Sequence, residues 1–241
     1  MMKEKLAVMG QLTAQFAHEI GTPLNAMGGH LQFLQDDILR VAGDAPWLNR
    51  TAIIGDQLLK IENIVKSFLH STSKPPSQYQ LFDVNQVLEK TLGIVSPRIG
   101  SLGVRLEKVI DRSLAPVRAV PLDIEQILLN LLNNSLDSLQ AKQKGQPGSS
   151  LKLEVFSRMK KEGLEEWLEL GVEDSGLGIT KSNLGKVFKP FFTTKAAGEG
   201  TGLGLTICQE IARKYRGNLA IESKEGAWTR VVLQLPYGVH T

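Results

Sequence analysis

A histidine, a carboxylate and a hydroxyl lie close together near the beginning of the chain: His18, Glu19 and Thr22. Apolar residues repeat every seven positions around them, which predicts one long helix packed against other helices. In that helix, His18 and Glu19 fall just off the apolar seam, and Thr22 lies one turn further along the same outer face. A neutral, solvated imidazole beside a carboxylate is suited to attack a group that arrives from outside.

Two asparagines form a second group of interest. Asn130 and Asn134 lie one turn apart on a helix predicted over 124–141, and they share a face with Asp137. An amide oxygen is a suitable neutral ligand for Mg²⁺ that also bridges phosphates. The alternative is that both amides are only solvated or cap a helix. Another stripe of the same helix is expected to face the core and comprises Ile124, Leu128, Leu131, Ser135 and Leu139.

Asp174 ends a predicted strand and is followed by Gly176 and Gly178. A carboxylate at a strand end accepts a hydrogen bond from an exocyclic amine such as that of adenine. The two glycines allow the backbone to approach a base closely. The alternative is an ordinary Asp-Ser-Gly turn.

A glycine-rich run, Gly200-Thr201-Gly202-Leu203-Gly204, opens a predicted helix. Successive backbone amides at a helix N-terminus form a cradle for phosphates, although glycine runs also occur in flexible loops. The spacing is not that of a Walker motif. The preceding loop, 186–195, carries aromatic anchors and is typical of a functional lid. Lys189 or Lys195 would neutralise phosphate charge there, and the sequence does not choose between them.

The elements that position these residues fall into two parts. Residues 1–73 show heptad repeats on two helices joined by a turn near Asp44 and Pro46, which predicts an antiparallel helical hairpin. A lone hairpin cannot bury both apolar seams, so we expect a homodimer in which two chains form a four-helix bundle. Residues 74–80 are the predicted linker, and residues 81–241 form a second domain.

The second domain alternates helical and strand patterns, and the fold class of the whole chain is α+β. We expect helices on one face of a largely antiparallel sheet, which makes this domain an α/β sandwich. The predicted helices span 84–99, 124–141 and 203–215. The predicted strands span 104–110, 151–159, 167–174, 218–222 and 228–235.

Composition limits the function classes. A net charge of +3 over 241 residues is too small to indicate binding to nucleic acid. The single cysteine, Cys208, excludes an internal disulfide framework and is expected in a helix core rather than as a reactive thiol. The sequence has no apolar run of about 18 residues and no signal peptide pattern. We therefore expect a cytoplasmic chain, with any membrane contact made only by segments absent from this sequence.

Five motifs in order give a specific resemblance: His-Glu-x-x-Thr-Pro, Asn-x-x-x-Asn, Asp-x-Gly-x-Gly, Phe-x-Pro-Phe-Phe and Gly-x-Gly-Leu-Gly. Together they resemble a sensor histidine kinase of a two-component system. Such proteins have a dimerisation and histidine-phosphotransfer module, followed by a catalytic ATP-binding domain of the Bergerat (GHKL) type. The resemblance implies ATP and Mg²⁺ as cofactors. It also implies autophosphorylation of a histidine and transfer of the phosphoryl group to an aspartate of a response regulator receiver domain.

The resemblance also implies roles for individual residues. His18 would be the phosphoacceptor, Glu19 a base or orienting carboxylate, and Thr22 would orient a water during dephosphorylation of the regulator. Asn134 would bind Mg²⁺ with support from Asn130. The remaining nucleotide contacts would come from Asp174 at the adenine amine and from Gly176, Gly178, Lys189, Lys195, Gly200, Thr201, Gly202, Leu203 and Gly204.

One departure from the family pattern concerns charge. Asp137 stands where some relatives place a phosphate-binding lysine. Two other functions are compatible with parts of the sequence: an ATP-dependent clamp or chaperone-like ATPase of the same superfamily, and a protein that acts mainly as a phosphatase on its regulator. The His18 segment argues against the first. The intact nucleotide motifs make the second an additional activity rather than a replacement.

Overall fold

The computed structural model describes residues 27–31, 33–34, 54, 61, 79–163, 165–195, 200 and 202–237. The chain divides into two compact units, Met1–Pro75 with Thr193–Thr201 and Pro76–Phe192 with Gly202–Thr241. In the first unit, residues 27–31 and 33–34 are helical, as the heptad pattern predicts. The rest of the predicted hairpin, including His18, Glu19 and Thr22, lies outside the described residues.

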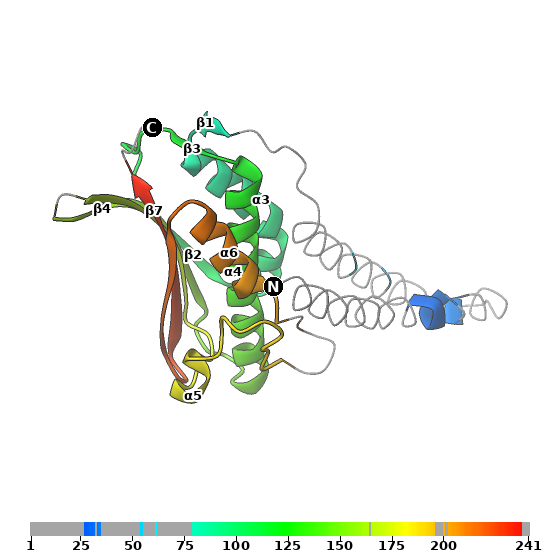
Figure 1. Ribbon diagram of the computed structural model, residues 1–241. Helices are drawn as coiled ribbons and strands as arrows, with labels where there is room; N and C mark the ends of the chain where they lie inside the picture. The colour runs from blue at the N-terminus through cyan, green and yellow to red at the C-terminus, as the bar shows by residue number, and fades with distance from the viewer. Residues whose placement is uncertain are drawn as a thin grey trace, which may run out of the picture. The chain divides into compact units, whose positions relative to one another are not determined.

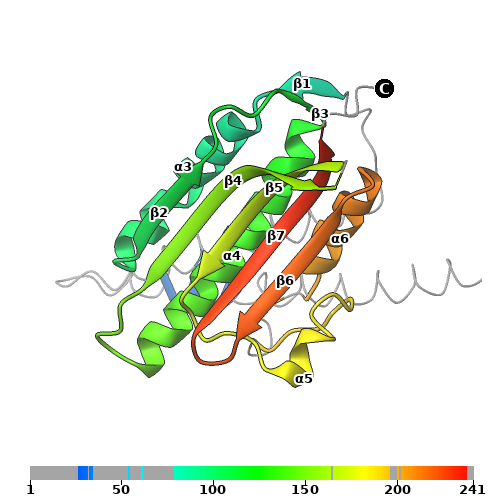
Figure 2. The same ribbon diagram turned by 90° about the vertical axis from the view of Figure 1, so that its left-hand side faces the viewer.

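The second unit is built on a five-stranded sheet with the strand order β2-β4-β5-β7-β6 (Figures 1 and 2). Three of its pairings are antiparallel, but β2 pairs with β4 in parallel. The sheet is therefore mixed, because the chain passes through a helix between these two strands instead of turning back in a hairpin. The strands are β2 (Arg105–Ile110), β4 (Lys152–Glu162), β5 (Glu165–Asp174), β6 (Asn218–Lys224) and β7 (Trp228–Tyr237).

Three helices cover one face of this sheet: α3 (Val84–Ser101), α4 (Pro121–Gly145) and α6 (Gly204–Lys214). Figure 2 shows the sheet in front and these helices behind it. The core lies between the two layers, and the stripe predicted to face it is buried on α4. Within the described part of the chain, we find no helix that is both long and apolar enough to span a bilayer.

The sequence patterns missed three short elements. Two are β1 (Gln80–Phe82) and β3 (Val117–Ala119), which pair with each other in a separate antiparallel sheet. The third is α5 (Lys181–Leu184), a single helical turn. Elements of three or four residues are too short to show a period, so only their backbone pairing reveals them.

The C-terminal end of α6 is fixed to the beginning of α4. Asp123 is 1% exposed, and its Oδ2 atom accepts hydrogen bonds of 2.5 Å from both Lys214 Nζ and Tyr215 Oη. Tyr215 Oη also accepts a hydrogen bond of 3.0 Å from the backbone N–H of Val120. The Tyr79 ring packs edge-on against the Tyr215 ring, with 5.9 Å between centroids. A charged, hydrogen-bonded cluster therefore joins two helices that also meet at the candidate site.

Candidate nucleotide-binding site

Helix α4 and the beginning of α6 bring the predicted asparagines to the glycine-rich segment. A Cβ atom placed on Gly204 would lie 3.6 Å from Asn130 Oδ1 and 4.0 Å from Asn134 Nδ2. Gly204 is the first residue of α6, and Leu203 is its N-cap. The first N–H groups of a helix have no partner within the helix and carry partial positive charge. This corner is therefore suited to a phosphate group together with its cation.

The amide of Asn130 is oriented by a residue of α6. Its Nδ2 atom donates a hydrogen bond of 3.6 Å to Cys208 Sγ. With Nδ2 held in this way, Oδ1 lies 3.6 Å from the Cβ position of Gly204, so the Asn130 side chain is fixed at the corner beside Asn134.

Asp174 lies at the end of β5 and is only 3% exposed. Burial raises the pKa of its carboxyl group to about 6, although hydrogen bonds from the Gly176 N–H and from the hydroxyls of Ser135 and Ser138 oppose this rise. The N–H of Gly176 donates to Asp174 Oδ1 over 2.9 Å. This carboxyl group is therefore held in one orientation by its own loop and by α4.

Only glycine fits at position 176. A Cβ atom there would lie 2.0 Å from Ser138 Oγ and 2.6 Å from Asp174 Oδ1. Ser138 in turn accepts a hydrogen bond of 3.0 Å from the backbone N–H of Leu177. The loop after Asp174 is therefore packed directly onto α4, one turn beyond Asn134.

The same loop rests on the β6–β7 turn on its other side. A Cβ atom on Gly178, which has a φ of 66°, would lie 2.1 Å from the carbonyl oxygen of Lys224. The N–H of Gly226 donates to the carbonyl of Leu177 over 2.6 Å, and the N–H of Ile179 donates to Ser223 Oγ over 2.8 Å. These contacts fix the loop between α4 and the turn.

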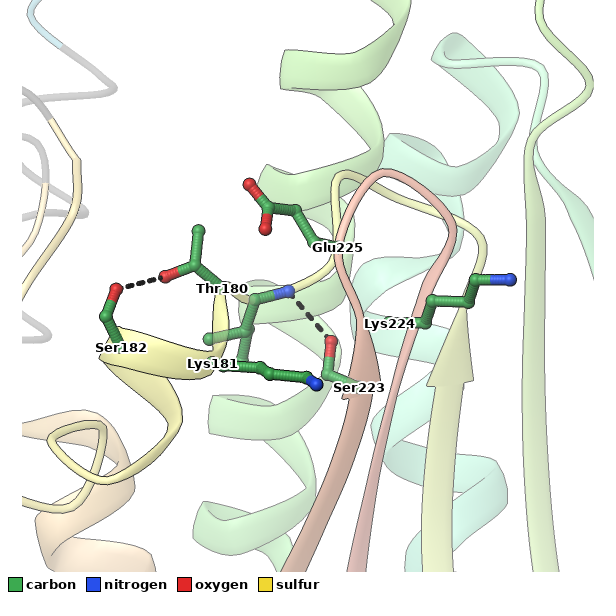
Figure 3. Close-up of a pocket in the computed structure, with 7 residues that line it drawn as sticks. Thr180, Lys181, Ser182, Ser223, Lys224 and Glu225 are labelled. Carbon is green, nitrogen blue, oxygen red and sulfur yellow. Dashed lines mark hydrogen bonds between the residues drawn. The ribbon is translucent and has the colours of Figure 1, made fainter.

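A pocket of about 480 Å³ lies beside this contact. Figure 3 shows Thr180 and Ser182 turned toward each other on one side, with Ser223 on the strand that faces them. Asp174 and the two asparagines are not among its lining residues, so it borders the loop rather than the candidate site itself. It is lined by Ile179, Thr180, Lys181, Ser182, Ser223, Lys224 and Glu225.

The segment before the glycine-rich run is anchored by its aromatic residues, as predicted. Phe188 packs against the core, and its carbonyl accepts a hydrogen bond of 3.3 Å from Thr206 on α6. The N–H of Phe191 donates to the carbonyl of Gly202 over 3.0 Å. A Cβ atom on Gly202 would lie 2.3 Å from the carbonyl carbon of Phe191, so this approach also requires glycine. The two motifs therefore meet at the beginning of α6.

The predicted lysines lie in different units. Lys189 is exposed and belongs to the second unit. Lys195 and Gly200 belong to the first unit, where a Cβ atom on Gly200 would lie 3.0 Å from Lys195 Cδ. Thr201 lies outside the described residues. The structure therefore brings together the asparagines, Asp174 and the end of the glycine run, and leaves the choice between the lysines a prediction.

An arginine outside all the predicted motifs lies next to this site. Arg98 on α3 places Nη2 2.5 Å from Asp137 Oδ1 and 3.1 Å from Gln140 Oε1. The side chains of Arg98 and Asp137 are 34% and 33% exposed. The predicted acidic residue on the face of Asn134 is therefore part of an ion pair that links α3 to α4.

Comparison with known proteins agrees with this arrangement. Residues 119–239 match the family described as histidine kinase-, DNA gyrase B- and HSP90-like ATPases. The chain belongs to this family. The predicted resemblance to sensor histidine kinases is confirmed by this match and by the relatives described next.

Several of the relatives are named histidine kinases. The chain is 29% identical over 233 residues to the signal transduction histidine-protein kinase AtoS of Escherichia coli (strain K12), covering 97% of this chain and 36% of AtoS. Its fold is similar to that of histidine kinase ThkA in complex with the response regulator protein TrrA, with a TM-score of 0.70 and 24% identity, covering 98% of this chain and 64% of that one. It is also similar to full-length ShkA in complex with AMPPNP, with a TM-score of 0.64 and 20% identity over 95% and 46% of the two chains. The chain spans less than half the length of the curated relatives it matches.

Within this ATPase fold, sequence reasoning missed three polar residues beside Asp174. Ser135 was expected only as a core residue, but its hydroxyl contacts the carboxyl group, and Ser138 does the same one turn further on. Thr229 is 8% exposed, pairs in register with Asp174 across β5 and β7, and shares a hydrogen bond of 3.0 Å with Ser223. For Ser135 and Thr229, a small hydroxyl residue at a buried position of an amphipathic helix or strand is the sequence signal that could have indicated the contact.

The thiol of Cys208 is expected to be inert in the folded protein. It is 0% exposed, and burial raises its pKa to about 12, so almost no thiolate exists at pH 8. We expect a thiol-reactive disulfide reagent at pH 8 to leave the native protein unlabelled and to label one thiol per chain in 6 M guanidinium chloride. Rapid labelling of the native protein would contradict the predicted core position.

Proposed function

We propose that this chain is the catalytic core of a sensor histidine kinase that transfers the γ-phosphoryl group of ATP to His18. The observation that carries the proposal is the meeting of Asn130 and Asn134 with the first residue of α6, on the same helix that holds Asp174 in place. This arrangement provides phosphate and adenine contacts on one rigid support. The family match, and the AMPPNP in the complex of the similarly folded ShkA, support the binding of a nucleotide by this domain.

Each described residue has a distinct part in holding ATP. Asp174 accepts the hydrogen bond of the adenine amine in its ionised form. The N–H groups at Gly204 and the residues after it bind the phosphates. Asn134 would hold Mg²⁺ through its amide oxygen with support from Asn130, and the bound ion would supply positive charge that offsets the charge on the phosphates. Among the described residues, no group of three or more His, Cys, Asp or Glu side chains could hold a metal ion.

The transfer step uses the residues predicted on the first helix. A ring nitrogen of His18 forms a bond to the γ-phosphorus while the bond between that phosphorus and the β–γ bridging oxygen breaks, and ADP leaves. Glu19 holds the proton on the other ring nitrogen, which stabilises the imidazolium as it forms. The phosphoryl group then passes to an aspartate of a response regulator, as the ThkA–TrrA complex suggests for a partner of this class. In a separate phosphatase activity, Thr22 would orient a water that attacks the phosphoryl-aspartate of the regulator and releases inorganic phosphate.

The proposal includes an assembly. Residues 1–73 form the dimerising helical hairpin, 74–80 the linker and 81–241 the ATP-binding domain. Two chains bury their apolar seams in a four-helix bundle, which presents His18 on its surface.

The test is labelling with ATP that carries a radioactive γ-phosphate. We expect the parent chain to acquire a label that survives base and is lost in acid, and His18→Ala to acquire none. His30→Ala is the matched control, because His30 is a helical histidine of the same unit, and it should label normally. ATP binding and hydrolysis without any label at His18 would contradict the kinase and favour an ATPase of the same family.

A further inference from the structure

Asp137 places a negative charge next to the site where the phosphates are proposed to bind. It lies one helical turn after Asn134, on the same face of α4, and Asn134 Nδ2 lies 4.0 Å from the Cβ position of Gly204. A triphosphate bound at this corner would meet the field of that carboxylate. An acidic residue is therefore unfavourable at this position unless its charge is offset.

Arg98 supplies the offsetting charge from a different helix. Its Nη2 atom lies 2.5 Å from Asp137 Oδ1 and 3.1 Å from Gln140 Oε1, so the guanidinium contacts two residues that are one turn apart on α4. About two thirds of each charged side chain is buried, which weakens screening by water relative to a fully exposed pair. Gln140 holds the guanidinium beside the carboxylate and adds no charge of its own.

We propose that Arg98 is a positioning residue for ATP binding: by neutralising Asp137, it sets the affinity of the site for the charged phosphates. This inference rests on the proposed binding of ATP. The alternative is that the pair only ties α3 to α4. The two explanations differ in one respect, because an electrostatic role depends on the charge of the ligand, whereas loss of a structural tie weakens binding of every ligand alike.

The experiment measures equilibrium binding of ATP, ADP and adenosine to the whole chain and to its variants. We expect Arg98→Ala to weaken ATP binding on the order of tenfold at low salt, ADP binding less, and adenosine binding not at all. Added salt should reduce the ATP defect. Arg98→Lys, which keeps the charge, should retain most of the affinity for ATP.

The double variant Arg98→Ala/Asp137→Asn decides the mechanism. It should bind ATP about as well as the parent chain, because both charges are gone, while Asp137→Asn alone should bind ATP as well or better. If the double variant is as weak as Arg98→Ala, or if adenosine binding falls as much as ATP binding, the inference is overturned. Thermal unfolding of each nucleotide-free variant shows whether it is folded. A parent chain that binds no ATP would overturn the proposed function itself, whereas normal ATP binding by Arg98→Ala would overturn only this inference.

Discussion

Replacing Asp174 by asparagine is expected to abolish measurable ATP binding and, at the same time, to stabilise the nucleotide-free protein. ATP binding is lost because an amide has only one acceptor oxygen, which the Gly176 N–H occupies, so the NH₂ group would face the adenine amine in place of a charged acceptor. Stability increases because the buried carboxylate is unfavourable: its pKa rises from 3.8 to about 6 in the folded chain. At pH 7 the carboxyl group is ionised in both states, and the penalty of keeping that charge buried is present in full.

The pH dependence of stability follows from the same shift. Because the folded-state pKa exceeds the unfolded value, the folded chain holds the proton more tightly between pH 4 and 6. The contribution of this group to stability is therefore largest below about pH 4 and is lost as the pH rises through about 6. The pKa shift from 3.8 to about 6 lowers the free energy of unfolding at neutral pH by at most about 3 kcal/mol relative to low pH. The Asp174→Asn variant should regain part of this loss at pH 7.

Denaturant unfolding at pH 5 and pH 7, together with ATP titration, checks this prediction. The gain in stability of Asp174→Asn should be larger at pH 7 than at pH 5, and ATP binding by the parent should weaken as the pH falls through about 6. The control is Glu173→Gln, the adjacent residue, which pairs with Arg230 at 3.5 Å and should bind ATP normally. A destabilised Asp174→Asn variant would show that the hydrogen bonds to the carboxylate outweigh its burial.

Replacing Gly178 by alanine is expected to destabilise the second unit by about 3 kcal/mol or more and to weaken ATP binding. The new Cβ atom would lie 2.1 Å from the carbonyl oxygen of Lys224 and 2.7 Å from its carbonyl carbon, and backbone atoms cannot rotate away. The loop after Asp174 would have to leave the β6–β7 turn. Its contact with Ser138 on α4 would then be lost as well.

Gly226→Ala is the matched control for Gly178→Ala. Gly226 lies in the turn that Gly178 contacts and has a similar positive φ, 74° against 66°, but nothing lies within 4 Å of its Cβ position. It should therefore show only the backbone strain of a left-handed alanine, about 1 kcal/mol. Comparing the free energies of unfolding of the two variants, measured with denaturant, separates the effect of backbone strain from that of the steric clash. Equal losses would mean that the loop relaxes and that the close approach has little energetic importance.

The helices and long strands of the second unit were predictable because each is long enough to show a period. The helix predicted over 124–141 is found as Pro121–Gly145, with its apolar stripe buried and its asparagines on another face. The parallel pairing of β2 with β4 was not predictable, because it depends on which edge of the sheet the strand joins after a long connection. The alternation of apolar and polar residues indicates which face of a strand is buried, but it does not indicate which strands pair with it.

The candidate site was predictable to the extent that its chemistry is carried by local motifs. Asn134, Asp174 and Gly204 stand in short, recognisable patterns. The residues that support them do not: Ser138 becomes relevant only because the loop after Asp174 folds onto α4, and Arg98 lies 39 residues from its partner Asp137. Contacts between distant segments depend on packing, which no single stretch of sequence encodes.

The cluster of Asp123, Lys214 and Tyr215 has a mechanical consequence for α6. The helix has 11 residues and a length of about 16 Å, and its C-terminal end is held to α4 by a buried charge. We therefore expect movement of its N-terminal end, at Gly204, to be a rotation about the C-terminal end rather than a translation of the whole helix. Tyr79 packs against Tyr215 at this fixed end, so the beginning of the second unit contacts one end of α6, and the other end of the helix lies at the proposed phosphate site.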